Sequence, residues 1–379
     1  MTETLNTVAT PNLILDRSTL ECNVKRMAQA ARRLGVSLRP HLKTPKSFPV
    51  AELMKEEGVA GFTVSTLQEA EHFAQADLGD LFYAVPLDAA KVSRCAKLLR
   101  RGVHLSFLAD TVEAARSCGE AAAQEGVRLP FWVEIDVDGY RTGVDPKGEE
   151  FVALAHLLQD HPSLQLVGLM SYGGICYKCD DRGCMARVAA DHHAALLSAK
   201  QRLAEVGIHA GRLSFGSTPA VLAAETLEGI DEVRCGIYAF QDLFQVGIGV
   251  CSIGDIALSV LTTVISHSAD RNRLTIDAGA LALSKDRSTQ GRPFDVGFGL
   301  ICDIDGQVVE DLYIETVSQE LGIVTTRSGV ALDLTRYPIG TRLRVLPNHA
   351  DMTAAAFESY TVVDRSAQIE AVWSRANRW

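Results

Sequence analysis

Hydrophobic and polar positions along the first 250 residues predict strands and helices in alternation. Short apolar runs of the kind found in buried parallel strands are separated by stretches in which apolar residues recur every three or four positions. We expect eight strands, at residues 38–43, 61–65, 81–85, 104–108, 131–136, 166–172, 212–216 and 232–236. Eight strands with helices between them predict a closed (β/α)8 barrel rather than an open sheet.

The first helix is the best marked of the helical stretches. Ser18 and Glu21 form a capping-box pattern at its start, and Gly35 is placed to end it. The apolar residues between them lie on one helical face: Leu20, Val24, Met27, Ala31 and Leu34. We expect further outer helices at residues 67–76 and 185–206.

Beyond about residue 250 the pattern changes to runs rich in Val, Ile, Thr and Leu, separated by turn residues. The expected strands are 257–266, 273–277, 342–346 and 360–363, with turns at 303–306 and 327–329. The early run 13–16 has the same character, and we expect it to join this part. The pattern therefore predicts two domains: a barrel formed by residues 17–250, and a β-rich domain formed by residues 1–16 and 251–379.

Composition fits this plan and excludes some functions. The chain has 379 residues, of which 47% are hydrophobic and 22% charged, as in a soluble globular protein with a large core. A formal charge of −10 argues against non-specific binding to nucleic acid or to anionic membranes, but not against a small anionic substrate. We see no secretory signal, no apolar run near the roughly 20 residues that span a bilayer, and no disulfide pattern among the cysteines. A cytoplasmic protein with reduced thiols is the expectation.

The stretch from Arg39 to Thr44 is the most informative for chemistry. In extended backbone His41 and Lys43 would project to the same side of the barrel wall. Burying an ammonium group costs several kcal/mol unless the lysine is paired or used chemically, and a Schiff base with an aldehyde cofactor removes that charge. The alternative is a lysine near the strand end that reaches solvent.

Two further motifs follow predicted strands. After the strand ending at Gly216, Ser217 and Thr218 could offer hydroxyl and backbone donors to a phosphate, although most such loops are only turns. After the strand 342–346, His349 and Asp351 stand two apart, and in extended backbone they would face the same way as a two-ligand metal site. A pair of exposed surface residues is the alternative for this second motif.

Other patterns favour ordinary structure over a site. Cys176, Cys179 and Cys184 suggest zinc, but the nearest extra ligands, His192 and His193, lie on a predicted helix. We favour free thiols in a loop over the barrel mouth, with both histidines on a solvated helix face. The run Gly247-Ile248-Gly249 lacks the third glycine of a dinucleotide fingerprint.

Taken in order, these motifs resemble the D-serine dehydratase / D-threonine aldolase family of alanine-racemase-like, fold-type III pyridoxal-phosphate enzymes. Within it they are most similar to the dehydratases of D-threo-3-hydroxyaspartate. The resemblance covers nearly the whole chain. The residues that carry it are Thr10-Pro11, Arg39-Pro40-His41-Leu42-Lys43-Thr44, Ser65-Thr66-Leu67-Gln68-Glu69-Ala70, Gly216-Ser217-Thr218-Pro219 and Pro347-Asn348-His349.

The resemblance implies a role for each matching residue. Lys43 corresponds to the Schiff-base lysine, with His41 beside it, and His349 and Asp351 correspond to a divalent-metal pair. Residues that correspond to the cofactor pocket are Gly216, Ser217, Thr218, Gly236 and Tyr238 around the phosphate, Arg141 on the aromatic side and Tyr172 close to the ring. The implied partners are a small D-amino-acid substrate and a second copy of the chain in a homodimer.

At two positions the chain departs from the dehydratases of the family. The dehydratases usually carry cysteine at the position of Asp351, whereas the aldolases carry aspartate there, as this chain does. The aspartate shifts the expected ion from Zn towards Mn, Mg or Co. The dehydratases tend to have Glu-His-Gly where this chain has Glu320-Leu321-Gly322. This chain therefore lacks that histidine, and proton transfer by its imidazole is lost.

The resemblance implies a metal-dependent lyase, and two outcomes differ in the bond broken. Overall similarity favours dehydration of D-threo-3-hydroxyaspartate or D-serine to a keto acid and ammonia. Asp351 favours aldol cleavage to glycine and an aldehyde. An amino-acid racemase or a non-catalytic pyridoxal-phosphate-binding protein is a further alternative, but the long β-rich part and the His349/Asp351 pair oppose the non-catalytic one.

Overall fold

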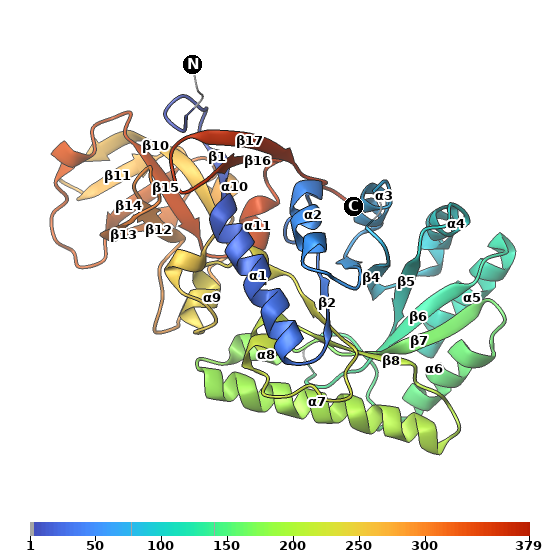
Figure 1. Ribbon diagram of the computed structural model, residues 1–379. Coiled ribbons are helices and arrows are strands. Elements are labelled where there is room, and N and C mark those ends of the chain that lie inside the picture. The colour runs from blue at the N-terminus through green and yellow to red at the C-terminus, as the bar shows by residue number, and fades with distance from the viewer. Residues whose placement is uncertain (1–3, 77, 140) are drawn as a thin grey trace. The chain divides into compact units, whose positions relative to one another are not determined.

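The computed structural model describes residues 4–76, 78–139 and 141–379 (Figure 1). By their contacts the residues form two compact units. The barrel unit comprises Lys25–Lys46, Val50–Gly236 and the last two residues, and the β unit comprises Met1–Val24, Ser47–Pro49 and Ile237–Asn377. The contacts thus assign residues 237–250 to the β unit, whereas the sequence pattern puts the boundary at 250.

Eight parallel strands form the sheet of the barrel unit, in the order β2-β9-β8-β7-β6-β5-β4-β3. They are β2 (Ser37–Pro40), β3 (Phe62–Val64), β4 (Leu81–Pro86), β5 (Leu105–Ala109), β6 (Leu129–Glu134), β7 (Leu164–Met170), β8 (Arg212–Gly216) and β9 (Glu232–Cys235). A bridge between His41 and Thr63 joins the two ends of this order. The sheet is therefore closed, and the predicted barrel is confirmed.

Helices follow the barrel strands and lie outside them (Figure 1). They are α2 (Phe48–Glu56), α3 (Leu67–Phe73), α4 (Val92–Arg100), α5 (Val112–Glu125), α6 (Glu149–Asp160), α7 (Arg182–Glu205) and α8 (Thr218–Ala223). Most residues of these strands are buried, as expected for parallel strands under helices, which explains apolar runs such as those of β5 and β6. One core cluster inside the barrel packs Phe82, Leu108, Trp132 and Met170 together.

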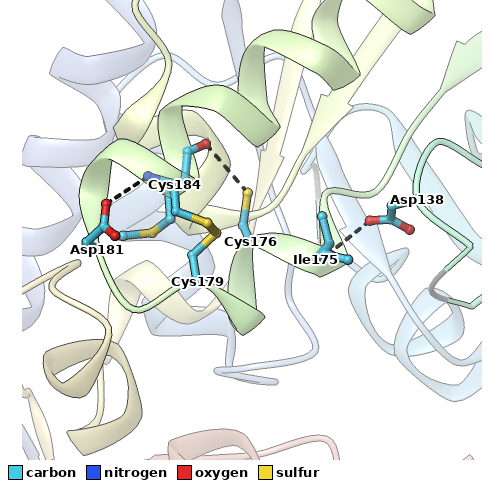
Figure 2. The surroundings of a disulfide bond; sticks show 7 residues. Asp138, Ile175, Cys176, Cys179, Asp181 and Cys184 are labelled. Atoms are coloured by element: carbon cyan, nitrogen blue, oxygen red, sulfur yellow. Dashed lines mark hydrogen bonds between the residues drawn. A yellow bond between two sulfur atoms is a disulfide. The ribbon is translucent and has the colours of Figure 1, made fainter. Parts of the chain in front are cut away.

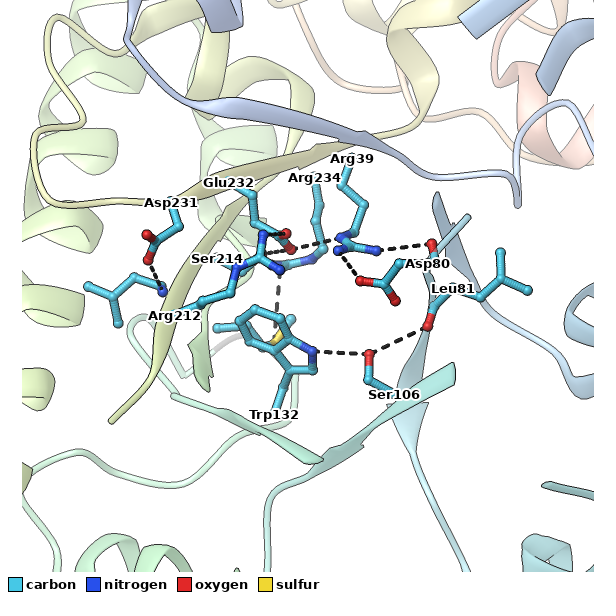
Figure 3. Close-up of polar contacts among 12 residues, drawn as sticks. Arg39, Asp80, Leu81, Ser106, Trp132, Arg212, Ser214, Asp231, Glu232 and Arg234 are labelled. Carbon is cyan, nitrogen blue, oxygen red and sulfur yellow. Dashed lines mark hydrogen bonds and ion pairs between the residues drawn. The ribbon is translucent and has the colours of Figure 1, made fainter. Parts of the chain in front are cut away.

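An ionic network links side chains of the barrel strands (Figure 3). Arg39 donates from Nε to Oε1 of Glu232 at 2.9 Å and from Nη2 to Oδ2 of Asp80 at 2.8 Å. Glu232 also accepts from Nη2 of Arg212 at 2.6 Å and from Oγ of Ser214 at 2.8 Å. The network therefore ties β2, β8 and β9 together, the three strands that lead to the predicted lysine and phosphate residues.

The N-terminal helix α1 (Arg17–Arg33) has a different cap from the predicted one. Oδ1 of Asp16 accepts from the backbone N–H of Thr19 at 2.8 Å, so Asp16 caps the helix. The hydroxyl of Ser18 instead donates to Oδ1 of Asp364, so the capping box predicted at Ser18 is wrong. The helix ends as predicted before Gly35, whose φ of 70° suits glycine at this position.

Nine strands form the sheet of the β unit, in the order β11-β14-β13-β12-β15-β10-β1-β16-β17, and β11 also pairs with β10. They are β1 (Asn12–Asp16), β10 (Leu258–Ser268), β11 (Arg273–Ile276), β12 (Gly299–Cys302), β13 (Val308–Val317), β14 (Gly322–Thr326), β15 (Arg342–Pro347), β16 (Ser359–Val363) and β17 (Ile369–Ser374). The first strand pairs with β10 and β16, so the prediction that it joins the β-rich part is confirmed.

Short helices complete the β unit. They are α9 (Leu243–Gly247), α10 (Ala280–Leu283) and α11 (Ala350–Ala354), of which α10 and α11 contact each other. In the part of the chain that the structure describes, no helix combines the length and the apolar character needed to cross a membrane.

Candidate active site

Lys43 lies in the turn that follows the closure of the barrel. The backbone N–H of His41 donates to the carbonyl of Cys235 at 2.7 Å, and that of Leu42 donates to the carbonyl of Thr63 at 2.8 Å. The strand itself ends at Pro40, so the predicted strand 38–43 is three residues too long, and Lys43 is not extended. Its backbone N–H instead donates to Nδ1 of His41 at 3.3 Å, which brings the two predicted residues together by a turn rather than by strand alternation.

The surroundings of His41 are cationic. Burial lowers the pKa of His41 well below its usual value, and the charges of Lys43, Arg234 and Arg141 lower it further. Its Nε2 lies 3.3 Å from the hydroxyl of Ser65. His41 is therefore neutral near pH 7, and the cations around it make this end of the barrel attractive to an anion such as a phosphate.

The predicted phosphate loop follows β8 directly. Ser217 has a φ of 106°, and its hydroxyl donates to the carbonyl of Gly173 at 3.1 Å. Thr218 is buried and begins α8. A Cβ atom at Gly216 would lie 2.9 Å from Nη2 of Arg234, so a side chain at this position would have to displace that guanidinium. The loop is thus a turn of strained backbone in which glycine keeps the strand end open.

The end of β9 borders the lysine turn. A Cβ atom at Gly236 would lie 3.1 Å from Oγ1 of Thr44 and 3.2 Å from Cβ of His41. The hydroxyls of Thr44 and of Ser171 are buried and have no hydrogen-bond partner among the described residues. Buried hydroxyls usually have partners, so these two fit a ligand at this end of the barrel. Pyridoxal phosphate supplies acceptor atoms of the kind they lack.

Arg141 and Tyr172 stack on each other. The guanidinium carbon of Arg141 lies 4.4 Å from the centre of the Tyr172 ring, and both residues line a small recess with Glu134 and Thr142. Burial raises the pKa of Glu134, whose Oε2 accepts from the hydroxyl of Thr142 at 2.7 Å. The structure therefore brings two predicted cofactor residues together. Tyr140, the first residue of the predicted Tyr-Arg-Thr-Gly motif, is outside the described residues.

The cysteine loop after β7 differs from expectation (Figure 2). Cys179 and Cys184 form a disulfide, so the prediction of free thiols is wrong for both. Of the three cysteines in this loop, Cys176 keeps a free thiol, which is buried. His192 is also not on a solvated face. It is buried, with Nε2 3.6 Å from Oδ2 of Asp138. The backbone N–H of Ile175 donates to Oδ2 of Asp138 at 3.0 Å, so this aspartate holds the loop.

The predicted metal pair lies in the β unit, where β15 leads into α11. His349 is extended, with φ −137° and ψ 108°, but Asp351 is already in the helix. The argument that both residues lie in extended backbone is therefore wrong, although both stand at the same strand end. Tyr238, predicted to hold phosphate, is buried in the turn Ile237–Ala239, and its contacts also assign it to the β unit.

Carboxylates surround the imidazole of His349. Burial opposes its charged form, but the hydrogen bond with Asp286 and the charges of Asp242 and Asp351 outweigh burial and raise the pKa of His349 to about 9. Burial raises the pKa of Asp242 to about 6. Sequence reasoning missed Asp242 and Asp286, because neither belongs to a motif near His349.

An imidazole among carboxylates is a donor set that suits Mn, Co or Zn. Within residues 4–76, 78–139 and 141–379, no group of three or more His, Cys, Asp or Glu side chains is arranged to hold a metal ion. The metal-binding roles of His349 and Asp351 therefore stay predictions from the sequence.

Two family models match the chain. The alanine racemase N-terminal domain matches residues 15–243, and a serine dehydratase domain matches residues 257–363. A D-threo-3-hydroxyaspartate dehydratase of Delftia sp. (strain HT23) is 39% identical over 100% of both chains, and a 3-hydroxy-D-aspartate aldolase of Paracoccus denitrificans (strain Pd 1222) is 30% identical over 97% of this chain and 91% of its own. The chain belongs to the D-serine dehydratase / D-threonine aldolase family.

The solved structures agree with this assignment. A cysteine-to-alanine mutant of D-threo-3-hydroxyaspartate dehydratase in the metal-free form is 38% identical to this chain, covers 100% of both and superposes with a TM-score of 0.96. Dehydratases and aldolases are lyases, and this chain is a lyase of the alanine-racemase-like fold. The cofactor that this family implies is pyridoxal phosphate.

Proposed function

We propose that this chain is a pyridoxal-phosphate- and divalent-metal-dependent lyase that acts on β-hydroxy amino acids of D configuration. One observation carries the proposal: Lys43 lies in the turn at which the barrel closes, beside a neutral His41 and the buried, unpartnered hydroxyl of Thr44. A lysine in this position, among cations and unused donors, suits a covalently held anionic cofactor better than a structural role.

Each residue predicted to bind the cofactor has a part in this proposal. Pyridoxal phosphate, when bound, supplies an aldehyde that bonds to an amine and a conjugated ring that withdraws electrons from Cα of the substrate. Lys43 would hold the aldehyde, and the loops at Gly216, Ser217, Thr218, Gly236 and Tyr238 would hold the phosphate. Arg141 and Tyr172 would orient the ring.

The amine of Lys43 would also serve as the base that takes the Cα proton of the substrate. Because the amine lies on one face of the site, it selects one configuration, and the family implies D. His41, being neutral, is able to exchange a proton with this amine or with the substrate. A proton held at Nζ of Lys43 can then be returned to the product.

His349 and Asp351 would hold the divalent ion, which supplies a Lewis acid for an oxygen on Cβ. A carboxylate ligand at position 351 favours Mn, Mg or Co over Zn. The metal site would lie at the end of β15, beside His349. We propose in addition that the chain works as a homodimer.

Dehydration is the outcome that we favour. Loss of the Cα proton to Lys43 with departure of the β-hydroxyl as water leaves an enamine, which a water molecule hydrolyses to a keto acid and ammonia. The full-length similarity to D-threo-3-hydroxyaspartate dehydratase supports this outcome. Aldol cleavage is the second candidate, because an aspartate at 351 could accept the β-hydroxyl proton in place of a thiolate. It would release glycine and an aldehyde.

The test incubates the purified protein with D-threo-3-hydroxyaspartate, D-serine and D-threonine, with and without EDTA. Keto acid and ammonia that disappear with EDTA are expected. Glycine with an aldehyde would select the aldolase instead. Turnover that EDTA leaves unchanged, or racemisation alone, would contradict the metal-dependent lyase. The corresponding L amino acids serve as the control for configuration.

A further inference from the structure

The imidazole of His349 has one nitrogen already engaged. Nδ1 lies 2.6 Å from Oδ2 of Asp286. The other oxygen of Asp286, Oδ1, accepts from the hydroxyl of Ser288 at 2.6 Å, and the backbone N–H of Asp286 donates to the hydroxyl of Ser284 at 3.0 Å. Both oxygens of this carboxylate therefore have partners, and the side chain is held from its own loop as well as from the ring.

The loop that carries Asp286 is fixed on both sides of His349. Oδ1 of Asn348 accepts from the backbone N–H of Thr289 at 3.1 Å, and Nδ2 of Asn348 donates to the hydroxyl of Thr289 at 2.8 Å. On the other side, the hydroxyl of Thr353 donates to the carbonyl of Leu283 at 2.8 Å. The residues before and after His349 thus bind the two ends of the same loop, which leaves little freedom for the distance between His349 and Asp286.

This geometry assigns the two nitrogens of the ring. An ionised carboxylate accepts hydrogen bonds and donates none, so Nδ1 of His349 must carry the proton of the hydrogen bond with Asp286. The lone pair available to a metal is then that of Nε2. Histidines that bind metals nearly always donate their other N–H to such an acceptor, which fixes the ring and raises its basicity.

We propose that Asp286 is a positioning residue that orients His349 so that Nε2 is the metal-binding nitrogen. The inference rests on the proposed function, because it takes His349 as a metal ligand. It adds a residue 63 positions away in the chain that touches neither the substrate nor the ion. Asp286 acts through His349, and its contribution is to the affinity for the ion and not to the binding of the barrel cofactor.

The neighbouring carboxylate Asp295 offers a matched control. It binds Arg287 at 3.0 Å in the same region, and its side chain is 33% exposed, against 30% for Asp286. Asp286→Asn and Asp295→Asn therefore remove one charge each from similar surroundings. Only the first replaces the charged acceptor that holds His349 by a neutral amide.

The first measurement is the Kd of Mn²⁺ for the full-length protein after EDTA treatment, from the electron paramagnetic resonance signal of free Mn²⁺. Asp286→Asn should weaken binding by about 10–100-fold, the range for lost outer partners of metal-binding histidines, while Asp295→Asn stays within about twofold of the wild type. His349→Ala should abolish binding. The cofactor absorbance of Asp286→Asn should equal that of the wild type, which shows that the variant is folded.

The second measurement is the nitrogen-15 spectrum of the Zn²⁺-loaded protein, in which the signals of His349 are identified by their loss in His349→Ala. A proton on Nδ1 is expected, shifted in Asp286→Asn. A proton on Nε2, or Mn²⁺ binding in Asp286→Asn equal to that of the wild type while His349→Ala loses it, overturns the inference but leaves the proposed function standing. Wild-type Mn²⁺ binding in His349→Ala overturns the proposed metal site itself.

Discussion

Glu232→Gln tests whether the ionic network in the barrel holds the strands that carry the site. Glu232 and Arg39 are almost completely buried, with side-chain exposures of 0% and 1%. Glutamine keeps the volume of glutamate but removes its charge. The substitution therefore leaves the guanidinium of Arg39 in the barrel interior with one charged partner fewer and opens no cavity.

The size of the effect follows from the partners. Breaking a buried ion pair costs about 3–5 kcal/mol, because the remaining charge is left uncompensated. Arg39 retains Asp80 at 2.8 Å, which places the loss near the lower end, at about 3 kcal/mol. Arg212 adds little, because it is 42% exposed and exposed pairs contribute about 0–1 kcal/mol. For a unit of this size, the melting temperature should fall by about 6–12 °C.

Thermal unfolding by circular dichroism provides the measurement, and Glu71→Gln provides the control. Glu71 also binds an arginine through both oxygens, at 2.9 and 3.0 Å, but on the surface, where the side chains are 36% and 42% exposed. The control should lose at most about 1 kcal/mol. A loss for Glu232→Gln as small as that of the control would refute the argument from burial.

The pH dependence gives a second check. Burial raises the pKa of Glu232, but the charges and hydrogen bonds of Arg39, Arg212 and Ser214 outweigh it and hold the pKa below its usual value. A group whose pKa is lower in the folded state stabilises above its unfolded pKa, here about 4.3, and loses that contribution as the pH falls through the folded value. The difference between wild type and Glu232→Gln should be constant from about pH 6 to 8 and shrink below about pH 4.

Three further changes have expected outcomes. Asp351→Ala should lower bound metal, measured by mass spectrometry of the elements, together with the rate of turnover; unchanged metal would remove Asp351 from the ligands. Gly216→Ala places a Cβ 2.9 Å from Nη2 of Arg234. The free energy of unfolding, measured in urea, should therefore fall by about 1–3 kcal/mol, and an absorbance titration should show weaker cofactor binding. Wild-type values for both would show that the strand end has room. Cys184→Ser opens a disulfide across a sequence separation of 5, and such a short loop should contribute about 2 kcal/mol or less; a larger loss would show that Cys179 and Cys184 hold more than this loop.

Much of the fold could be predicted because burial imposes a repeating pattern. All eight barrel strands were expected within three residues of their bounds, since parallel strands under helices are rich in apolar residues. In the β unit, β12, β13, β14 and β17 were missed. The strand β13 is partly exposed along its length, so its sequence lacks the continuous apolar run that signals a buried strand.

Residues that act across long sequence separations were harder to predict. Asp286 meets His349 only because the loop 284–289 folds against the end of β15, and no local pattern reports that contact. His192 was placed on the wrong face, since a histidine beside small and polar residues shows no burial signal, and its neighbour Asp138 comes from another loop. The disulfide of Cys179 was missed for a similar reason, because spacing alone does not give the distance between two cysteines.

A covalent link between Lys43 and the cofactor is central to the proposed function. The full-length protein is loaded with pyridoxal phosphate, reduced with borohydride, digested and mapped by mass spectrometry. We expect the reduced cofactor on Lys43 in the wild type and in Lys46→Ala, since the ammonium of Lys46 already pairs with Glu69 at 3.0 Å, and none in Lys43→Ala. A cofactor attached to another lysine, or full attachment and turnover in Lys43→Ala, would contradict the account.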